Sequence, residues 1–249
     1  MNPDAMAPFG LALLACFRGD SEAQLLIRRD DGKEDRLPMS LFFRAAAEFT
    51  PIEVAALDRC RGHVLDIGAG SGVHSLFLQA HGKRVTAIDI DPRAVRVMKE
   101  RGVQDPQRAD VLEYDGGPFD TLLMLGHGVG MVEDLAGLSR FLDVARRLMG
   151  GDGRLLLHSL DVTRTRDPEH LSYHEANQRA GRYAGEIRMR FEYDGKRGPY
   201  CGWLHVDPRT LKRHAERAGW SMETVVAEES GDYLASLAPN RTSSVQAEG

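Results

Sequence analysis

The chain has 249 residues, of which 42% are hydrophobic and 28% charged, an ordinary balance for a soluble globular protein. Its net charge of −5 argues against nucleic acid or an anionic membrane surface as a partner. The three cysteines, Cys16, Cys60 and Cys201, are far apart and odd in number. They predict no disulfide framework and no metal site, and they fit a cytoplasmic location.

The first 60 residues are predicted to form an N-terminal helical cover with one hairpin. An apolar stretch at 9–17 is too short to cross a bilayer and predicts a helix near 8–18 that packs on the rest of the protein. The dipeptide Asp31-Gly32 follows a short apolar run and predicts a hairpin turn. A further helix is expected near 40–58.

A glycine-rich turn follows the next apolar run. Residues 64–67 read as a strand with an acid, Asp66, and glycines then recur at alternate positions, Gly68, Gly70 and Gly72, before a helical pattern begins. Such a strand–turn–helix lets backbone N–H groups approach a nucleotide closely. The dinucleotide fingerprint has its third glycine at the sixth position, which is Val73 here, so the spacing argues against an NAD-dependent oxidoreductase.

A second apolar run ends in an acid at the distance that one strand–helix–strand unit requires. Asp89 follows residues 85–88 and lies 21 positions after Gly68 (89 − 68), where a carboxylate can accept both ribose hydroxyls. The glycine spacing and this acid together resemble the class I S-adenosylmethionine-dependent methyltransferases. The resemblance covers roughly residues 60–160.

The resemblance implies an α/β, Rossmann-like fold with a mostly parallel seven-stranded sheet, an antiparallel last strand, and helices on both faces. The alternating patterns of the chain fit it. Strands are expected near 63–67, 84–89, 106–109, 119–125, 153–159, 222–228 and 232–237, and helices near 72–81, 92–102, 134–149 and 208–219. The glycines of 150–153 are expected to end the helix before them.

We expect residues 61–238 to form the methyltransferase domain, with an insertion at 161–206 and a disordered tail at 239–249. Within the insertion, apolar and polar residues alternate over 187–193, which predicts a strand followed by a turn and a return strand near 200–206. Insertions at this place in the resembled fold help to build the acceptor pocket. The alternatives are an extension of the sheet or a dimer contact, and the sequence leaves the oligomeric state open.

The resemblance implies that S-adenosylmethionine is the methyl donor and that strand ends hold it. Asp89 would accept from the ribose, Ile90 would pack on the adenine, and Asp110 would accept from the adenine amine. Asp66 would act through the loop, and Arg44 would meet the donor carboxylate. The implied cofactor-binding residues are Asp66, Gly68, Ala69, Gly70, Gly72, His74, Asp89, Ile90, Asp110, Val111, Leu125 and Arg44.

Several of these residues also have plainer interpretations. His74 can cap the first turn of its helix, Arg44 can lie on a solvated helix face, and Asp110 can be a surface carboxylate.

Three polar residues near the ends of the fourth and fifth strands are the catalytic candidates: His127, His158 and Asp161. Carboxyl ends of strands in open α/β sheets face the ligand crevice. A neutral imidazole at 127 can act as a general base, although a single structural hydrogen bond explains it equally well. Strand alternation puts His158 and Asp161 on opposite faces, so we do not expect them to act as a pair.

The sequence therefore predicts a methyltransferase that moves a methyl group from S-adenosylmethionine to a small-molecule acceptor by in-line displacement. A protein or RNA methyltransferase is one alternative, disfavoured by the acidic balance and the lack of a separate RNA-binding module. A non-catalytic S-adenosylmethionine-binding protein is the other, because methyl transfer needs alignment of donor and acceptor more than it needs reactive side chains.

Overall fold

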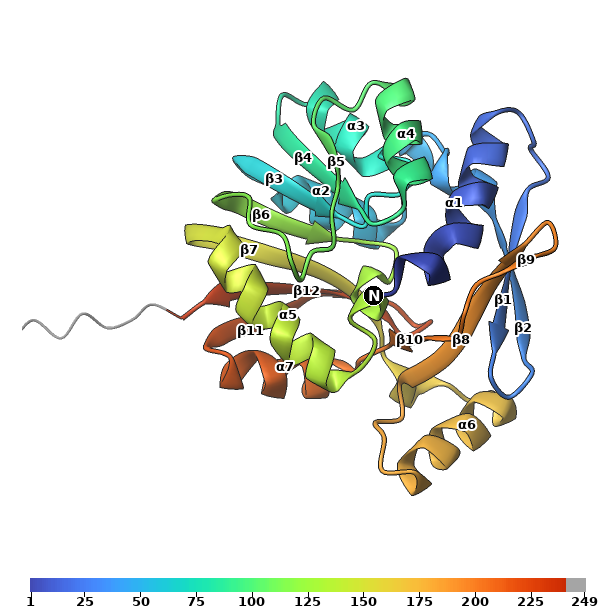
Figure 1. Ribbon diagram of the computed structural model, residues 1–249. Coiled ribbons are helices and arrows are strands. Elements are labelled where there is room, and N and C mark those ends of the chain that lie inside the picture. The colour runs from blue at the N-terminus through green and yellow to red at the C-terminus, as the bar shows by residue number, and fades with distance from the viewer. Residues whose placement is uncertain (241–249) are drawn as a thin grey trace, which may run out of the picture.

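The computed structural model describes residues 1–240, so the predicted tail lies almost wholly outside the described residues. The larger of its two sheets has seven strands in the order β11-β12-β7-β6-β3-β4-β5 (Figure 1). These strands are β3 His63–Ile67, β4 Arg84–Asp89, β5 Pro106–Arg108, β6 Phe119–Met124, β7 Met149–Leu160, β11 Trp220–Ala227 and β12 Asp232–Pro239. Only β12 runs antiparallel to both neighbours, which confirms the predicted sheet.

Helices cover both faces of this sheet, as predicted. They are α2 Pro51–Arg59, α3 Val73–Ala80, α4 Pro92–Arg101, α5 Leu135–Leu148 and α7 Pro208–Arg217. Apolar residues of α5 and α7 pack on one face of the central strands, and those of α2 and α3 pack on the other. Two of the helices begin at an Asp-Pro pair, where Asp91 and Asp207 accept hydrogen bonds from backbone N–H groups of the first turn.

Two local predictions are wrong. The expected helix at 40–58 is two short 3-10 turns, η1 Met39–Phe42 and η2 Ala46–Glu48, followed by α2. Pro51 starts a new helix there, because proline fits the first turn and disfavours helical backbone before it. The glycines of 150–153 do not simply close α5; they lie within β7, whose pairing with β6 is irregular at that point. The irregular pairing accommodates residues that are poor strand formers.

A second sheet joins the N-terminal hairpin to the insertion. Its strands are β1 Gln24–Arg29, β2 Glu34–Pro38, β8 Glu186–Tyr193, β9 Lys196–Arg197 and β10 Cys201–Leu204. The path is β10-β8-β1-β2, with β9 paired to β8. The hairpin at Asp31-Gly32 and the alternating strand over 187–193 are therefore confirmed.

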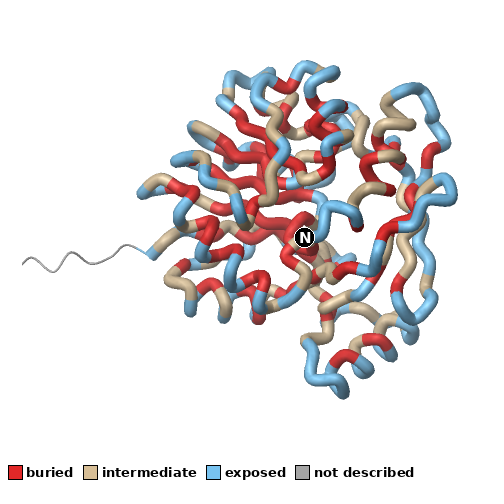
Figure 2. Tube along the Cα trace, viewed as in Figure 1, coloured by how far each residue is buried: buried red, intermediate tan, exposed pale blue. Residues whose placement is uncertain are grey.

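Helix α1 (Pro3–Phe17) lies between the two sheets (Figure 1). Its residues Phe9 and Leu13 join a core cluster with Leu25, Met189 and Phe191 of the second sheet. Figure 2 shows buried chain in the central strands of the large sheet and again in α1 with the strands that it faces. Helix α1 and the second sheet thus share a core cluster that is separate from the clusters around the large sheet.

Helix α6 (Pro168–Arg179) was not predicted, although Asp167-Pro168 repeats the helix-start signal of α4 and α7. The buried Tyr173 attaches it to the second sheet. Its hydroxyl donates to Asp30 at 2.7 Å and accepts from the backbone N–H of Arg188 at 3.0 Å, while the Arg29 guanidinium lies 4.2 Å from the ring centre.

None of the helices in residues 1–240 is long and apolar enough to span a membrane.

Candidate active site

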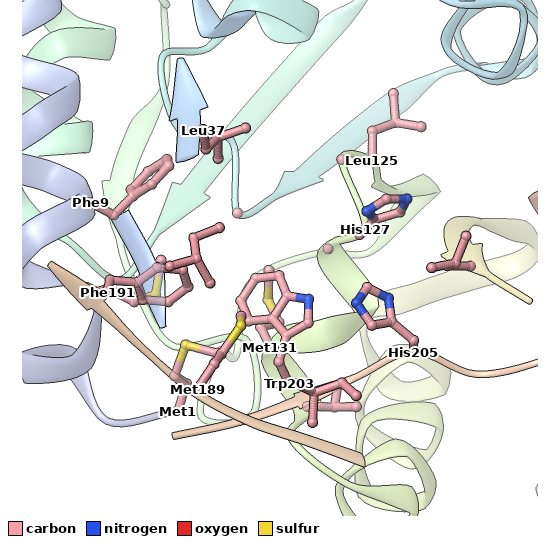
Figure 3. A pocket seen from close by; sticks show the side chains of 18 of the residues that line it. Met1, Phe9, Leu37, Leu125, His127, Met131, Met189, Phe191, Trp203 and His205 are labelled. Atoms are coloured by element: carbon pink, nitrogen blue, oxygen red, sulfur yellow. The ribbon is translucent and has the colours of Figure 1, made fainter. Parts of the chain in front are cut away.

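A cavity of about 770 Å³ lies between the carboxyl ends of the large sheet's strands and the inner face of the second sheet. Figure 3 shows Phe9, Met189 and Phe191 on one side of it and His127 and His205 on the other. Most of the predicted site residues line this cavity: Arg44, Asp66, Gly68, Ala69, His74, Asp89, Ile90, Asp110, Val111, Leu125, His127 and Asp161. Gly70, Gly72 and His158 are not among its lining residues.

The glycine turn forms one wall of the cavity. Gly68, Gly70 and Gly72 all have positive φ, at 69°, 56° and 75°, a conformation that side chains disfavour. A Cβ at Gly72 would lie 2.6 Å from the Val103 side chain, so this glycine permits close packing. The turn holds its own shape through the N–H groups of Gly68 and Ala69, which both donate to the carbonyl of Ile88.

Asp89 has the features that a ribose-binding carboxylate needs. Its oxygens accept backbone N–H bonds from Gly70 at 3.0 Å and Asp91 at 2.9 Å. Each oxygen keeps lone pairs for a further donor, and the residue lines the cavity. Burial raises the pKa of Asp89 to about 6, although the two backbone hydrogen bonds oppose the increase. The nucleoside part of S-adenosylmethionine fits this cradle.

Asp66 and Asp110 lie on either side of Asp89. The buried Asp66 accepts a hydrogen bond from the Ser75 hydroxyl at 2.6 Å, which joins β3 to the first turn of α3, and burial raises its pKa. Asp110 accepts from the N–H of Leu112 at 2.9 Å, and its other oxygen lies 3.3 Å from the Met1 nitrogen. Asp110 therefore lines the cavity while its carboxylate forms an ion pair with the N-terminal ammonium of Met1.

Arg44 and His74 meet at a residue that the sequence analysis missed. Both contact the same oxygen of Glu53, a buried carboxylate in the first turn of α2, with His74 Nε2 at 2.6 Å and the Arg44 guanidinium in direct contact. Burial opposes ionisation here, but hydrogen bonds from His74, Arg44 and Thr50 lower the pKa of Glu53 to about 2. Its signal was the spacing Thr50 to Glu53, a capping box.

A histidine cluster lies beside the adjacent strands β6, β7 and β12. His127 Nε2 is 2.5 Å and His158 Nε2 3.1 Å from the same carboxylate oxygen of Asp232. His205 lies against His127, with ring centres 5.4 Å apart. Hydrogen bonds from the two histidines hold the pKa of Asp232 far below its usual range, against the effect of burial.

Asp161 takes no part in that cluster. Its carboxylate accepts hydrogen bonds from the N–H and the hydroxyl of Thr163, at 3.0 Å and 2.6 Å, and so begins the short helix η4 (Val162–Arg164). His158 bonds to Asp232 instead. The expectation that His158 and Asp161 do not pair is therefore confirmed.

Sequence analysis also missed Asp232 and His205. Asp232 is the first residue of β12, and an antiparallel strand begins beside the carboxyl end of its neighbour, so it pairs with Leu160 at the end of β7. That signal was available once β12 was predicted to be antiparallel. His205 follows β10, and only the packing of the second sheet brings it to the cavity.

The family model described as methyltransferase domain matches residues 41–225. The chain is similar to a SAM-dependent methyltransferase from Bacteroides fragilis, solved with S-adenosyl-L-homocysteine. Identity is 32%, coverage is 96% of this chain and 98% of the other, and the TM-score is 0.84. The chain therefore belongs to the S-adenosylmethionine-dependent methyltransferases, which confirms the resemblance and the cofactor.

More distant relatives match in part. The ubiquinone biosynthesis O-methyltransferase of Xylella fastidiosa is 31% identical over 108 residues, which are 40% of this chain and 42% of that protein. The chain thus matches about two fifths of the length of such curated relatives. The CcbJ methyltransferase of Streptomyces caelestis shares the fold, with 14% identity, a TM-score of 0.59, and coverage of 79% of this chain and 93% of that one.

Proposed function

We propose that the protein transfers a methyl group from S-adenosylmethionine to a hydroxyl oxygen of a small molecule bound between the two sheets. The observation that supports this proposal is one continuous cavity whose two ends carry different chemical groups. The Asp89 carboxylate and the glycine turn lie at one end, and His127 and His205 lie at the other. The matched segment of the O-methyltransferase relatives is consistent with an oxygen acceptor.

The cavity wall predicts the shape and polarity of the acceptor. The second sheet contributes Ile27, Leu37, Ile187, Met189, Phe191 and Trp203, and Met131 also lines the cavity. An apolar wall with a few polar groups is typical of small-molecule sites. A flat or apolar body bearing one polar group near His127 fits it, whereas an extended protein or RNA segment needs an open groove.

Each donor-side residue then has a positioning task. When bound, S-adenosylmethionine supplies a methyl group activated by the positive sulfonium. Asp89 accepts from the ribose hydroxyls, and the Gly68 turn lets the backbone approach the donor closely. Asp110 and Val111 border the adenine, and Arg44 and His74 lie where the amino-acid end would extend. His127 receives the proton that a hydroxyl acceptor must lose.

Product analysis tests this proposal. The protein is incubated with S-adenosylmethionine and, separately, with catechol, tyramine, thiophenol, total RNA and bulk protein, and formation of S-adenosylhomocysteine is measured. The proposal expects turnover with a hydroxylated aromatic compound and none with RNA or protein. Turnover with only RNA or protein contradicts the small-molecule acceptor. Tight donor binding without turnover on hydroxylated aromatics at any pH indicates a non-catalytic binder.

A further inference from the structure

Three side chains from separate strands converge beside the acceptor end of the cavity. His127 follows β6, His158 lies near the end of β7, and Asp232 begins β12. Asp232 pairs with Leu160, and His158 pairs with Leu234 two residues along each strand. The period of two puts His158 and Asp232 on the same face of the sheet, which explains why the imidazole reaches the carboxylate.

The backbone at His127 is held in an uncommon conformation. Its φ is 57° and its ψ 28°, in the left-handed region that non-glycine residues rarely adopt. Gly126 and Gly128 flank it, and the His127 carbonyl accepts from the N–H of Gly130. Strain of this kind persists where the surroundings fix it and is frequent at functional sites.

The hydrogen bonds determine which ring nitrogen of His127 is free. The backbone N–H of His127 donates to His158 Nδ1 at 3.5 Å, so the proton of neutral His158 is on Nε2, which donates to Asp232. The ionised carboxylate only accepts, so His127 Nε2 also carries a proton. His127 Nδ1 is left as an acceptor, and no side-chain hydrogen bond within residues 1–240 uses it.

Only one of the three histidines is suited to receive a proton. Burial and the nearby His127 lower the pKa of His205 to about 3, and burial lowers the pKa of His158. Both rings therefore stay neutral near pH 7. The titratable groups facing His127 are His158 from β7, His205 after β10 and Asp232 from β12, with Asp161 on the same cavity.

We propose that Asp232 is the positioning residue of the methyl-transfer step: it fixes His127 with Nδ1 toward the acceptor and stabilises the imidazolium that forms. This inference rests on the proposed function and explains how the general base, His127, is held in place. The acceptor oxygen forms a bond to the methyl carbon, the carbon–sulfur bond breaks with its electron pair on sulfur, and the hydroxyl proton moves to His127 Nδ1. The Asp232 charge then balances the imidazolium.

A positioned base also defines the acceptor class. A neutral amine can attack the methyl group first and release its proton to water afterwards. A neutral hydroxyl cannot follow this order, because the protonated ether that would result is a very strong acid of high energy. The hydroxyl proton must therefore leave while the methyl group is transferred. The cluster therefore fits a neutral hydroxyl on an apolar body.

Imidazole NMR tests the arrangement without any acceptor. Nitrogen-15 spectra of the complex with S-adenosylhomocysteine are recorded against pH, and His127→Asn assigns the His127 signals, since asparagine tolerates positive φ. The proposal expects neutral His127 to carry its proton on Nε2, and Asp232→Asn to lower its pKa by about 1–3 pH units. A proton on Nδ1 in the wild type, or an unshifted His127 in the variant, overturns the proposal.

Turnover with a hydroxylated aromatic acceptor gives the second readout. Asp232→Asn is expected to reduce kcat roughly 10²–10⁴-fold and to move the acid limb of the pH profile to lower pH, with S-adenosylhomocysteine affinity changed less than about twofold. Glu223→Gln, an exposed residue of β11, changes the charge equally and is expected to behave as wild type. If the pH profile of kcat in Asp232→Asn is not shifted, Asp232 has only a structural role, and the proposal is contradicted.

A metal centre is the competing explanation, because the three side chains also have suitable ligand atoms within 4.8 Å of one another. The proposal is overturned if the wild type binds one Co²⁺ per chain and Asp232→Asn does not, and if a chelator abolishes turnover and added metal restores it. Chelator-resistant turnover together with the shifted His127 titration supports it. If the NMR spectra show the expected His127 tautomer and shift but no methylated product forms, the result counts against the proposed function and not against the arrangement of the cluster.

Discussion

At the scale of single residues, we expect Asp89 to make donor binding depend on pH. Its pKa near 6 means that half of the free protein holds a protonated carboxyl at that pH, whereas ribose hydroxyls donate to the charged form. Affinity for S-adenosylhomocysteine is therefore expected to increase as pH rises through about 6. Asp89→Asn is expected to weaken binding by about 1.5–3 kcal/mol and to flatten this dependence. Calorimetry from pH 5 to pH 8 measures both.

The control for this prediction is Glu113→Gln, which changes the charge at a nearby exposed residue. It should keep the wild-type affinity and its pH dependence. If Asp89→Asn binds S-adenosylhomocysteine as tightly as the wild type, Asp89 does not hold the ribose.

Glu53 is expected to stabilise the folded protein in its ionised form. Because its folded pKa of about 2 is below the ordinary value of 4.5, its contribution is present above pH 4.5 and is lost as pH falls toward 2. The shift corresponds to about 3 kcal/mol at neutral pH. Glu53→Gln should lower the free energy of unfolding by roughly this amount at pH 7, measured by urea denaturation.

The pH dependence separates this effect from a simple packing defect. The difference between wild type and Glu53→Gln should shrink between pH 5 and pH 3, because the wild-type carboxylate becomes protonated in the unfolded chain only. Asp58→Asn, on the exposed face of the same helix, is the matched control and should lower the free energy of unfolding only slightly. A difference that is constant with pH is the result that would argue against the ion pairs.

At the scale of elements, α6 lines the part of the cavity where we propose that the acceptor binds, and one tyrosine helps to attach it. It supplies His170 and His174 to the cavity, and the Tyr173 hydroxyl forms two hydrogen bonds, to Asp30 directly after β1 and to the backbone of β8. Tyr173→Phe should destabilise this attachment by about 1–3 kcal/mol and speed amide exchange across Pro168–Arg179. The acceptor KM should increase while S-adenosylhomocysteine affinity stays unchanged.

Tyr193→Phe removes a single hydroxyl–carboxylate bond, to Asp20, at the other end of β8 and serves as the control. It should leave amide exchange in α6 and the acceptor KM as in the wild type. Equal effects of the two substitutions would mean that α6 does not shape the acceptor site.

The two sheets differ in how far sequence predicts them. The strands of the large sheet follow from local patterns, and the spacing from Gly68 to Asp89 fixes one strand–helix–strand unit. The second sheet pairs Ile27 with Phe191, far apart in the chain, and nothing local specifies that register. Proline and glycine signals were also misinterpreted, at Pro51 as a helix interior and at 150–153 as a helix end.

The same limit applies to the site. The donor-side residues lie at ends of consecutive parallel strands, a position that sequence order determines, and most of them do line the cavity. Glu53, His205 and Asp232 come from elements that reach the cavity only by tertiary packing. Each is a buried or half-buried polar group whose partners, not its neighbours in sequence, define its role.

At the scale of the whole molecule, the two sheets share one cavity. The large sheet provides the residues that we propose bind the donor, and the second sheet with α1 and α6 lines the rest of the cavity. We therefore expect donor and acceptor to meet in the part of the cavity that His127, His205 and Trp203 line (Figure 3). Enclosure of this kind excludes water from the reacting groups.

A crystal structure of the complex with S-adenosylhomocysteine would show whether donor and acceptor share this cavity. We expect the ribose hydroxyls to bind the Asp89 carboxylate and the sulfur to face His127, with the second sheet opposite. A ligand whose ribose avoids Asp89, or whose sulfur points away from His127 toward solvent, would contradict this expectation.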